Sequence, residues 1–536
     1  MHSRRVITLG TIATAALVTA LAWPLPPEGF VSGDQGVKLI AALNAVAHPV
    51  LPTQVMLPRV EGAPAPYMDP FFTRHGDHAH ALQSPLFPVI TAPLVAMFGL
   101  RGAYVLPALA FVVLLPLVRG LVRATAPAVP LAAVACCTVL VSPVFFYAFE
   151  FWEHVPAIAV LAGASVLVTR APHHPWAGPA VAGVLAGIAV LLRPEAIWYA
   201  AALGLPGGVS RRTLVYVSGS AMVLATFAAL NVWEGGSPLG YHASANLAAL
   251  SDRWALTRLE RLTVWMLSPH PLFLAALVGL GVSYVVWWRR HSDLAVSVAL
   301  ASAALLALGR LAGAYGADAL WYAWPVGGLA LVPVATTQGL RQLRWLAGAT
   351  LMGVWLTSTG DGGAQWGPRI LLIATPALVA LAAVGLSEAL RKGPTQTIRI
   401  GLVCVILTCG LWTSRAAYRD LRGAKQTYAR VVRGIEAETP PGAYVLTNVW
   451  WLDQIAASLY GSRTFLVTSA DAGPAQVLAT LERAGVPSVS LAWSTEPGAS
   501  GPMSTAGTCY SITATIDLPD RGLHVARADC ERPVSR

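Results

Sequence analysis

Charged side chains are scarce in this sequence. Asp, Glu, Lys and Arg together make up 12% of the 536 residues, whereas a typical soluble domain carries about 25%. A soluble chain of this length would need more charge to cover its surface, so the deficit excludes an ordinary soluble protein. Hydrophobic residues make up 55%, and apolar runs near membrane-spanning length recur as far as about residue 414. The sequence therefore predicts a polytopic α-helical membrane protein.

Cysteine is also scarce, and the basic residues form no patch. The net charge of +10 is carried largely by residues that sit in pairs between apolar runs, as the positive-inside rule expects. This pattern excludes nucleic acid as a partner. Four of the six cysteines lie inside apolar runs, and the other two, Cys509 and Cys530, flank a hairpin-like stretch near the C-terminus. On an oxidising side of the membrane these two are predicted to form a disulfide.

The apolar runs predict about thirteen transmembrane helices. They lie near 6–24, 101–118, 128–147, 154–170, 177–192, 195–208, 213–231, 269–288, 293–311, 319–339, 345–359, 368–388 and 398–414. The short runs at 177–192 and 195–208 also fit one broken helix. The run at 86–99 is too short for a span, and we interpret it as a re-entrant or interfacial helix.

The charges of the loops indicate the orientation in the membrane. With the N-terminus in the cytoplasm, the basic residues fall in inside loops: Arg119, Arg123, Arg170, Arg211, Arg212, Arg289, Arg290, Arg341, Arg344, Arg391 and Lys392. The outside loops at 148–153 and 312–318 carry no Lys or Arg, and thirteen spans put the C-terminus outside. Residues 20–22 also resemble a signal-peptidase site. A retained first helix is favoured because the later spans need a starting orientation.

This topology divides the chain after residue 414. Residues 1–414 form a transmembrane domain with a long first extracytoplasmic loop, 25–100, and residues 415–536 form an extracytoplasmic domain. In the second domain, strand-like runs at 444–446, 464–468 and 488–493 alternate with helix-like runs at 451–460 and 474–484. Such alternation predicts a small α/β domain with a parallel sheet.

The first extracytoplasmic loop opens with Gly33-Asp34-Gln35-Gly36-Val37-Lys38. Asp34 and Lys38 are one helical turn apart. A carboxylate so close to the membrane surface is well placed to act as a general base on an acceptor hydroxyl or amine. A helix N-cap is the alternative interpretation of Asp34, and the spacing alone favours it.

A polar stretch follows at 67–80. It contains Asp69 and then His75, Asp77 and His78, which are residue types that bind divalent metals. Their spacing matches no compact zinc motif. A polar loop that faces the substrate is therefore favoured over a metal site at His75, Asp77 and His78.

Three further polar clusters border the apolar runs. Glu153 and His154 lie at the outer end of the third span, where buried charge is expensive and usually functional. Arg193 and Glu195 separate two short spans, either as a structural ion pair or with Arg193 as a phosphate ligand. The glycine-rich segment 360–369 ends with Arg369. The predicted topology puts these clusters and the first loop on the same outer side, which predicts one site there.

The order and sidedness of these motifs resemble the GT-C membrane glycosyltransferases. That superfamily includes the protein O-mannosyltransferases, the aminoarabinose transferases of lipid A and bacterial proteins with an Rgt-like domain. The segments that carry the resemblance are Gly33–Lys38, Ser84–Pro88, Phe151–His154, Leu192–Glu195 and Trp366–Arg369. The resemblance implies an inverting transferase of the inner membrane. It would pass a sugar from a polyprenyl-phosphate donor to a glycan, lipid or protein acceptor on the extracytoplasmic face.

The resemblance also implies roles for single residues. An acidic residue of the first outer loop is the presumed base in the family, and that position matches Asp34. Relatives often carry Asp-Glu there, whereas this chain has Gln35, so Asp69 or Glu153 is the candidate second carboxylate. The candidate substrate-binding residues are Lys38, His154, Arg193, Glu195 and Arg369. Some relatives need a divalent metal and others do not, so the cofactor stays open. The absence of a phosphate loop or Rossmann fingerprint argues against a nucleotide-sugar donor.

Two other classes of protein fit parts of the pattern. Broken helices and intramembrane charges also mark transporters, but no internal repeat relates the two halves of this chain. A non-catalytic scaffold, whose α/β domain binds a partner, would explain the loss of a second acidic residue at Gln35. A transferase accounts for more of the motifs than either alternative.

Overall fold

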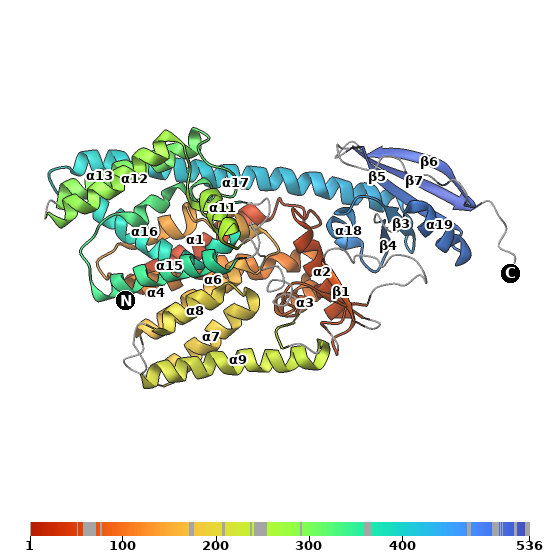
Figure 1. Ribbon diagram of the computed structural model, residues 1–536, viewed down its shortest axis with the longest axis horizontal. Helices are drawn as coiled ribbons and strands as arrows, with labels where there is room; N and C mark the ends of the chain where they lie inside the picture. The colour runs from red at the N-terminus through yellow and green to blue at the C-terminus, as the bar shows by residue number, and fades with distance from the viewer. Residues whose placement is uncertain are drawn as a thin grey trace. The chain divides into compact units, whose positions relative to one another are not determined.

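The computed structural model describes residues 2–50, 52–56, 71–75, 78–170, 176–205, 210–235, 238–240, 254–289, 292–358, 366–468, 473–495, 503, 505, 508–518 and 522–530. The chain divides into two compact units, whose elements Figure 1 labels. The helical unit consists of Met1–Ala22 and Leu106–Arg419, and the mixed unit consists of Trp23–Val105 and Asp420–Arg536. Each unit is therefore assembled from segments that are far apart in the sequence.

The helical unit is built from α-helices and a few tighter or wider turns. Its helices are α1 (His2–Ala22), α4 (Val105–Thr125), α5 (Leu131–Ala135), α6 (His154–Arg170), α7 (Ala177–Leu192), α8 (Ala196–Gly204), α9 (Arg211–Gly235), α11 (Trp254–Met266), α12 (Pro271–Trp288), α13 (Ser292–Leu311), α14 (Leu320–Ala323), α15 (Gln338–Thr357), α16 (Thr375–Ala389) and the first part of α17 (Gln396–Glu438). Helices close in sequence pack together, as α12 does with α13 and α7 does with α9 (Figure 1). The short connection between α12 and α13 favours an antiparallel pair, whereas α7 and α9, with α8 between them in the sequence, run parallel, since Gly183 meets Tyr216 and Gly187 meets Val223.

Many of these helices are suited to a membrane. Within the described residues, seven stretches are long and apolar enough to cross one: Arg5–Ala22, Leu86–Thr125, Arg211–Trp233, Pro271–Trp288, Ser292–Leu311, Arg369–Ala389 and Gln396–Glu438. Shorter apolar helices occupy Leu131–Leu140, His154–Thr169 and Ala177–Leu192. The predicted polytopic α-helical membrane fold is therefore confirmed.

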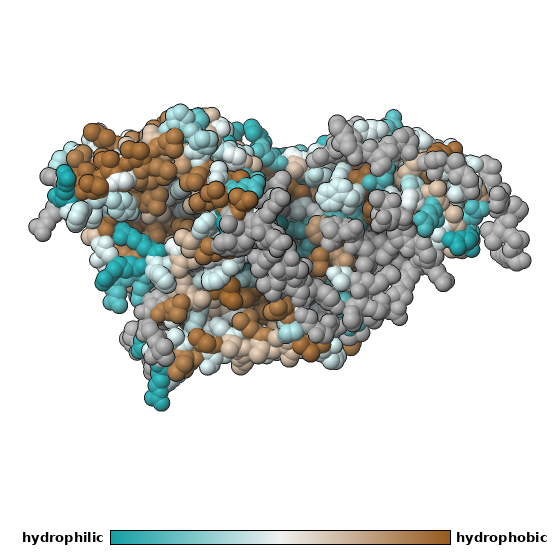
Figure 2. Space-filling model, viewed as in Figure 1, coloured by the Kyte–Doolittle hydropathy of each residue, from teal (hydrophilic) through white to brown (hydrophobic). Residues whose placement is uncertain are grey.

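Several of these helices expose apolar side chains instead of burying them. On α12 the exposed set is Leu274, Leu277, Val278, Val282, Tyr284, Val285 and Trp288, and Figure 2 shows hydrophobic surface gathered over α12 and α13. A soluble monomer rarely tolerates so large a continuous apolar patch. In a bilayer, the same surface is covered by lipid tails.

Two of the predicted spans are not single α-helices. In 128–147, α5 continues as one π-helical turn, η2 (Cys136–Leu140), and a 3-10 turn, η3 (Phe146–Phe149). In 319–339, α14 gives way to the 3-10 helix η6 (Pro325–Leu331). Pro325 lacks an amide hydrogen, and a side chain at Gly328 would collide with Ala303. Irregular backbone at membrane depth is tolerated only inside protein, and η6 is buried along most of its length.

The mixed unit combines the segment after α1 with the C-terminal part of the chain. Its first part holds α2 (Gly33–Ala47), the paired strands β1 (Phe72–His75) and β2 (His78–Ala81), α3 (Leu86–Phe98) and the 3-10 helix η1 (Gly99–Tyr104). Helix α2 packs against α3. Helix α3 ends at Gly99, whose φ of 60° is a conformation that side chains disfavour.

A five-stranded sheet forms the C-terminal part of the mixed unit. Its strands are β3 (Tyr444–Thr447), β4 (Thr464–Val467), β5 (Ser488–Ser494), β6 (Tyr510–Leu518) and β7 (Leu523–Cys530), in the order β4-β3-β5-β7-β6. Strand β3 is parallel to β4 and β5, and β7 is antiparallel to β5 and β6. Between the strands lie α18 (Leu452–Ile455), η8 (Ala457–Leu459) and α19 (Pro474–Arg483). The predicted α/β arrangement is confirmed, and the C-terminal hairpin extends it.

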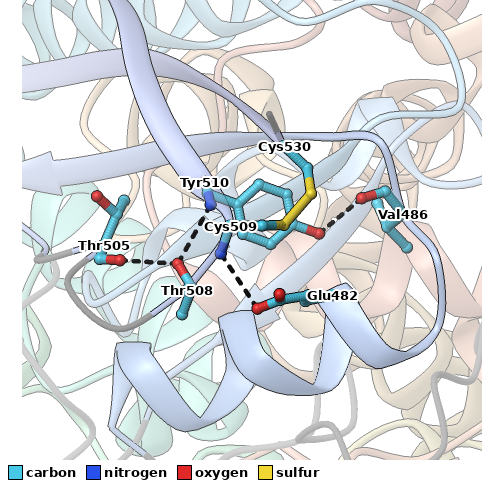
Figure 3. Close-up of a disulfide and its surroundings, with 7 residues drawn as sticks. All are labelled: Glu482, Val486, Thr505, Thr508, Cys509, Tyr510 and Cys530. Atoms are coloured by element: carbon cyan, nitrogen blue, oxygen red, sulfur yellow. Dashed lines mark hydrogen bonds between the residues drawn. A yellow bond between two sulfur atoms is a disulfide. The ribbon is translucent and has the colours of Figure 1, made fainter. Parts of the chain in front are cut away.

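The sheet has its own hydrophobic core and a covalent tie. Leu446, Leu466 and Leu491 of the strands pack with Val477 and Leu481 of α19. The predicted disulfide between Cys509 and Cys530 is present, and Figure 3 shows its surroundings.

Hydrogen bonds hold the polypeptide on either side of the disulfide. The amide of Cys509 donates to the Glu482 carboxylate over 3.1 Å, and the Tyr510 hydroxyl donates to the Val486 carbonyl over 2.7 Å (Figure 3). Both acceptors belong to α19 or to the turn that follows it. The disulfide therefore joins the hairpin of β6 and β7 at a point already bound to α19.

Removing this disulfide should loosen the hairpin. Replacing Cys509 and Cys530 by Ser removes a crosslink across 21 residues and should lower the free energy of unfolding of the sheet by about 3 kcal/mol, chiefly by freeing the unfolded chain. Urea-dependent proteolysis of the C-terminal segment measures the change. Cys404→Ser is the matched control, because Cys404 is an exposed free thiol. Equal urea midpoints for the double variant and the control would contradict the expectation.

Candidate functional site

The first turn of α2 carries Asp34. The carboxylate accepts a hydrogen bond from the Gln83 side-chain amide over 3.3 Å. The N-cap position is Ser32, so Asp34 lies inside the first turn and not at the cap. A negative charge there interacts favourably with the helix dipole, which requires no catalytic role. The Asp34 carboxylate therefore lies in the first turn of α2, beside the Gln83 side-chain amide.

Two neighbours of Asp34 on α2 are buried. Gln35 is fully buried, and its side-chain oxygen accepts a hydrogen bond from the Val31 amide over 2.9 Å. The family resemblance led to the expectation of a second carboxylate at this position, whereas here Gln35 closes the turn that leads into α2. Lys38 is 2% exposed, which is rare for a lysine and requires that its charge be compensated.

The segment before α2 is held by the C-terminal part of α17. The Lys425 ammonium donates to the Gly29 carbonyl over 3.0 Å and to the Tyr104 hydroxyl over 3.1 Å. Arg433 pairs with Glu28 over 3.0 Å. A side chain at Gly29 would collide with the main chain of Lys425. The position of the chain just before Asp34 is therefore fixed by residues nearly 400 positions later in the sequence.

The predicted metal-binding stretch is only partly described. Strands β1 and β2 pair antiparallel, with His75 opposite His78 in the backbone register. The side chains of these two histidines, and all of Asp69 and Asp77, lie outside the described residues. The metal site and the role of Asp69 therefore stay predictions. Within the described part of the chain, no group of three or more His, Cys, Asp or Glu side chains is arranged to hold a metal ion.

The helical unit gathers the other predicted residues around Arg193. This residue precedes Pro194, and the residue before a proline disfavours helical backbone, so α7 ends at Leu192. The guanidinium then bridges two carboxylates, Glu153 over 3.0 Å and Glu195 over 2.8 Å. The predicted ion pair at a helix break is present, with one additional partner. Because its charge is already balanced, Arg193 is a weaker candidate for a phosphate ligand than the sequence suggested.

Aromatic rings pack beside this ion cluster. The rings of Tyr147 and Trp152 lie 5.2 and 5.5 Å from the ring of His154, measured between centroids. Trp152 is fully buried, and its indole N–H has no hydrogen-bond acceptor among the described residues. Buried donors are normally satisfied, so this N–H is suited to an oxygen atom of a ligand or a water molecule.

Arg369 extends the same group of residues. Its guanidinium carbon lies 5.6 Å from the centre of the Trp152 ring, within the range of a cation–π interaction. The preceding segment is held by a hydrogen bond of 2.9 Å from the Tyr147 hydroxyl to the Trp366 carbonyl. Five of the predicted residues, Glu153, His154, Arg193, Glu195 and Arg369, therefore belong to one continuous cluster in the helical unit.

Arg310 is a member of this neighbourhood that the sequence analysis missed. It lies in the last turn of α13 and over the ring of Tyr322, with 3.5 Å between the guanidinium carbon and the ring centre. The rings of Trp366 and Trp412 are 5.9 and 5.3 Å away. The available signal was a lone arginine at the end of an apolar run, since charge at membrane depth usually has a role.

A buried acid in the mixed unit was also missed. Asp453 of α18 is fully buried, and one carboxylate oxygen accepts from the Gln454 amide over 2.9 Å. The second oxygen has no partner among the described residues. Burial raises the pKa of Asp453 to about 8, against the opposing effect of hydrogen bonds from the backbone amides of Gln454 and Asp453. The acid is therefore largely neutral at pH 7.

These features define a polytopic helical membrane protein with a small α/β sheet and two groups of charged residues. The fold is that of ArnT from Cupriavidus metallidurans. The crystal structure of that protein bound to undecaprenyl phosphate matches with a TM-score of 0.54 at 12% identity, covering 97% of each chain. Its apo crystal structure matches with a TM-score of 0.50 at 11% identity, covering 98% of each chain. The helical membrane fold with a small C-terminal sheet, expected from the sequence, is thus confirmed.

Comparison by sequence adds nothing to this likeness. No family model matches the chain, and no curated protein matches it significantly. The similarity is therefore one of fold, spread over nearly the whole length of both chains.

Breaking the Arg193 cluster should destabilise the protein strongly. Arg193→Ala leaves the buried carboxylate of Glu153 and the partly buried carboxylate of Glu195 without their cation, which costs about 3 kcal/mol. The thermal midpoint of the purified protein in detergent, followed by size-exclusion profile, measures the effect. Arg391→Ala is the matched control, because Arg391 pairs with Glu388 while 73% exposed, and such pairs contribute about 1 kcal/mol or less. Equal midpoints in the two variants would show that the buried pair contributes no more than the exposed one.

The buried acid should make stability depend on pH. The unfolded Asp453 carboxyl loses its proton near its ordinary pKa of 3.8, whereas the folded one keeps it up to a pKa of about 8. The folded state thus binds more protons between these values, so the free energy of unfolding falls as pH rises through this window. Asp453→Asn should flatten that slope between pH 5 and 8 in proteolysis assays of the mixed unit. Glu438→Gln, at an exposed carboxylate on α17 of the same unit, should leave it unchanged; identical slopes for both variants would refute the assignment.

Proposed function

We propose that this protein is a GT-C membrane glycosyltransferase that uses a polyprenyl-phosphate-linked sugar donor. It transfers the sugar, with inversion, to a glycan, lipid or protein acceptor on the extracytoplasmic face of the inner membrane. Asp34 is the base. The N-terminus lies in the cytoplasm, and the C-terminal domain lies on the other side.

One observation carries most of the weight. A structure of ArnT bound to undecaprenyl phosphate shares the fold of this chain over 97% of both lengths. A shared fold alone does not fix an activity. It gains weight here because the motifs of the first loop, of the cluster around Arg193 and of the segment ending at Arg369 had independently suggested the same superfamily.

The reaction needs little beyond a base and cations. Asp34 takes the proton of the acceptor hydroxyl or amine as the acceptor atom attacks the anomeric carbon of the donor sugar. The bond between that carbon and the phosphate oxygen breaks on the opposite side, which inverts the configuration. The electron pair leaves with the polyprenyl phosphate, which gains one negative charge. No nucleotide and no covalent intermediate takes part.

The leaving phosphate requires positive charge and hydrogen-bond donors. We assign Arg369 and Lys38 to this role, with Arg193 as a weaker candidate because Glu153 and Glu195 already balance it. The buried indole N–H of Trp152 beside Arg369 supports the assignment, since a phosphate oxygen would satisfy it. His154 and Glu195 are proposed to contact the sugar or acceptor.

A divalent metal enters no step of this mechanism. The described residues offer no ligand group for one, and the candidate set at His75, Asp77 and His78 lies in the partly described first loop. If a metal binds there, it would assist the departure of the phosphate as a Lewis acid.

The function is tested by sugar transfer in membranes. Radiolabelled sugars on polyprenyl phosphate are supplied to membranes that contain the intact protein or Asp34→Asn at equal levels. Loss of a general base lowers the rate about 100- to 10,000-fold, so transfer by Asp34→Asn should fall at least 100-fold. Asp517→Asn, which neutralises an exposed carboxylate of the same unit, is the control and should keep full activity.

The other outcomes separate the alternatives. Full activity of Asp34→Asn would exclude Asp34 as the base and direct the search to Asp69 and Glu153. Failure of the intact protein to transfer from any member of a broad donor panel would favour a transporter or a scaffold. Uptake of labelled substrate into sealed vesicles would then distinguish those two.

A further inference from the structure

The first turn of α2 is pressed against α18 within the mixed unit. Helix α2 packs on both α18 and η8. Gly33 and Gly36 are three residues apart and therefore lie on one face of α2. At this face the two elements approach more closely than any side chain on α2 would permit.

Gln454 fills the space that the two glycines leave. A Cβ atom on Gly33 would lie 1.9 Å from the Gln454 side-chain oxygen, and one on Gly36 would lie 1.7 Å from the Gln454 main-chain oxygen. Both distances are far below any real contact. The main-chain oxygen thus approaches the α-carbon of Gly36 directly, as in the weak Cα–H···O contacts of closely packed helices.

Gln454 itself is firmly held. It is 1% exposed, and its side-chain amide donates to the Trp450 carbonyl over 3.3 Å. Its backbone amide donates to the buried carboxylate of Asp453. The residue that meets α2 is therefore fixed in both its main chain and its side chain.

The start of α2 is anchored locally by Gln35, whose side chain accepts from the Val31 amide, and not by its N-cap residue. Ser32 occupies the N-cap, but its side chain makes no capping hydrogen bond, although serine is among the preferred capping residues. The backbone amides of the first turn thus receive no help from a side chain at Ser32. Contact with α18 therefore holds this turn together with the hydrogen bond between Gln35 and Val31.

We propose that Gln454 is a positioning residue for Asp34, and that α18 fixes the rotation and height of the first turn of α2. Asp34 follows Gly33 directly, so any shift of that turn moves the carboxylate. A displacement of about 1 Å at a catalytic group can cost 100-fold in rate. The C-terminal part of the mixed unit, which contains α18, would then contribute to catalysis by orienting the base. The catalytic part of this inference rests on the proposed function of Asp34, whereas the seating of α2 on α18 does not.

A side chain added at Gly33 and one added at Gly36 would collide with different parts of Gln454. This difference provides the test. Gly33→Ala meets the Gln454 side chain, so Gln454→Ala should relieve the collision. Gly36→Ala meets the Gln454 main chain, which no substitution at that position removes. Gly33→Ala should lower kcat at least tenfold with little change in the donor KM, and Gly33→Ala/Gln454→Ala should recover to the level of Gln454→Ala alone. Gly36→Ala should lower kcat by a similar factor, and adding Gln454→Ala should not restore it.

Gly423→Ala is the matched control. Gly423 lies on α17 in the same unit, and a Cβ there would meet no atom within 4 Å, so activity should be unchanged. Gln454→Ala by itself only removes atoms and keeps the protein testable if a glycine variant fails to fold. It should lower kcat about threefold, because α2 loses its side-chain contact with α18.

Hydrogen exchange of the α2 peptide supplies a readout that needs no activity. Exchange in α2 should rise in Gly33→Ala and Gly36→Ala, and should return towards the original rate in Gly33→Ala/Gln454→Ala. Unchanged exchange and full transfer in both glycine variants would overturn the inference. If Gly33→Ala/Gln454→Ala alone regains slow exchange in α2 but the intact protein transfers no sugar, the contact between α2 and α18 is supported and the proposed function is rejected. Recovery of Gly36→Ala by Gln454→Ala would contradict the assigned contacts.

Discussion

The pairing of Arg193 with Glu153 and Glu195 determines how this end of the helical unit can be arranged. The three residues come from the start of α6, the end of α7 and the start of α8. Charge away from water must be compensated, so these three helix ends cannot move apart without exposing an uncompensated ion. The rings of Tyr147 and Trp152 pack next to this fixed point, and Arg369 packs on Trp152. These contacts hold the cluster together without a ligand, which would suit the stabilisation of a leaving phosphate under the proposed function.

Features of the fold that depend on local sequence could be predicted. Apolar length identified α9, α12, α13 and α16, because a helix in lipid must satisfy its own backbone and therefore needs an unbroken apolar run. The apolar run that ends at residue 192 marked the end of α7, and the structure supplies the reason, since the residue before a proline disfavours helical backbone. Alternating patterns gave the parallel strands β3, β4 and β5. The two cysteines of the hairpin were paired correctly because no others lie outside the apolar runs.

Features that depend on distant contacts could not be predicted. The segment that becomes η6 is apolar enough to be taken for a span, and only its burial permits the 3-10 backbone. Arg310 was missed although it is a charge in an apolar run, and the rings that surround it come from three separate segments. Gly33 and Gly36 suggested only a helix start. Gln454, more than 400 residues later, is what requires them, and nothing in either local sequence indicates the other.

The residues that hold the start of α2 lie far from it in the sequence, and this separation affects when Asp34 can become oriented. Only ten residues separate the end of α1 from the start of α2, and the N-cap residue of α2 makes no side-chain capping bond. Lys425 holds the segment before it through Gly29, and Gln454 holds its first turn. Both residues are synthesised after the last apolar run. Under the proposed function, Asp34 is therefore oriented only once the C-terminal segment has folded, and a chain that has inserted all its membrane helices is still inactive. Completion of the small sheet domain, which is remote in sequence, then makes the enzyme competent.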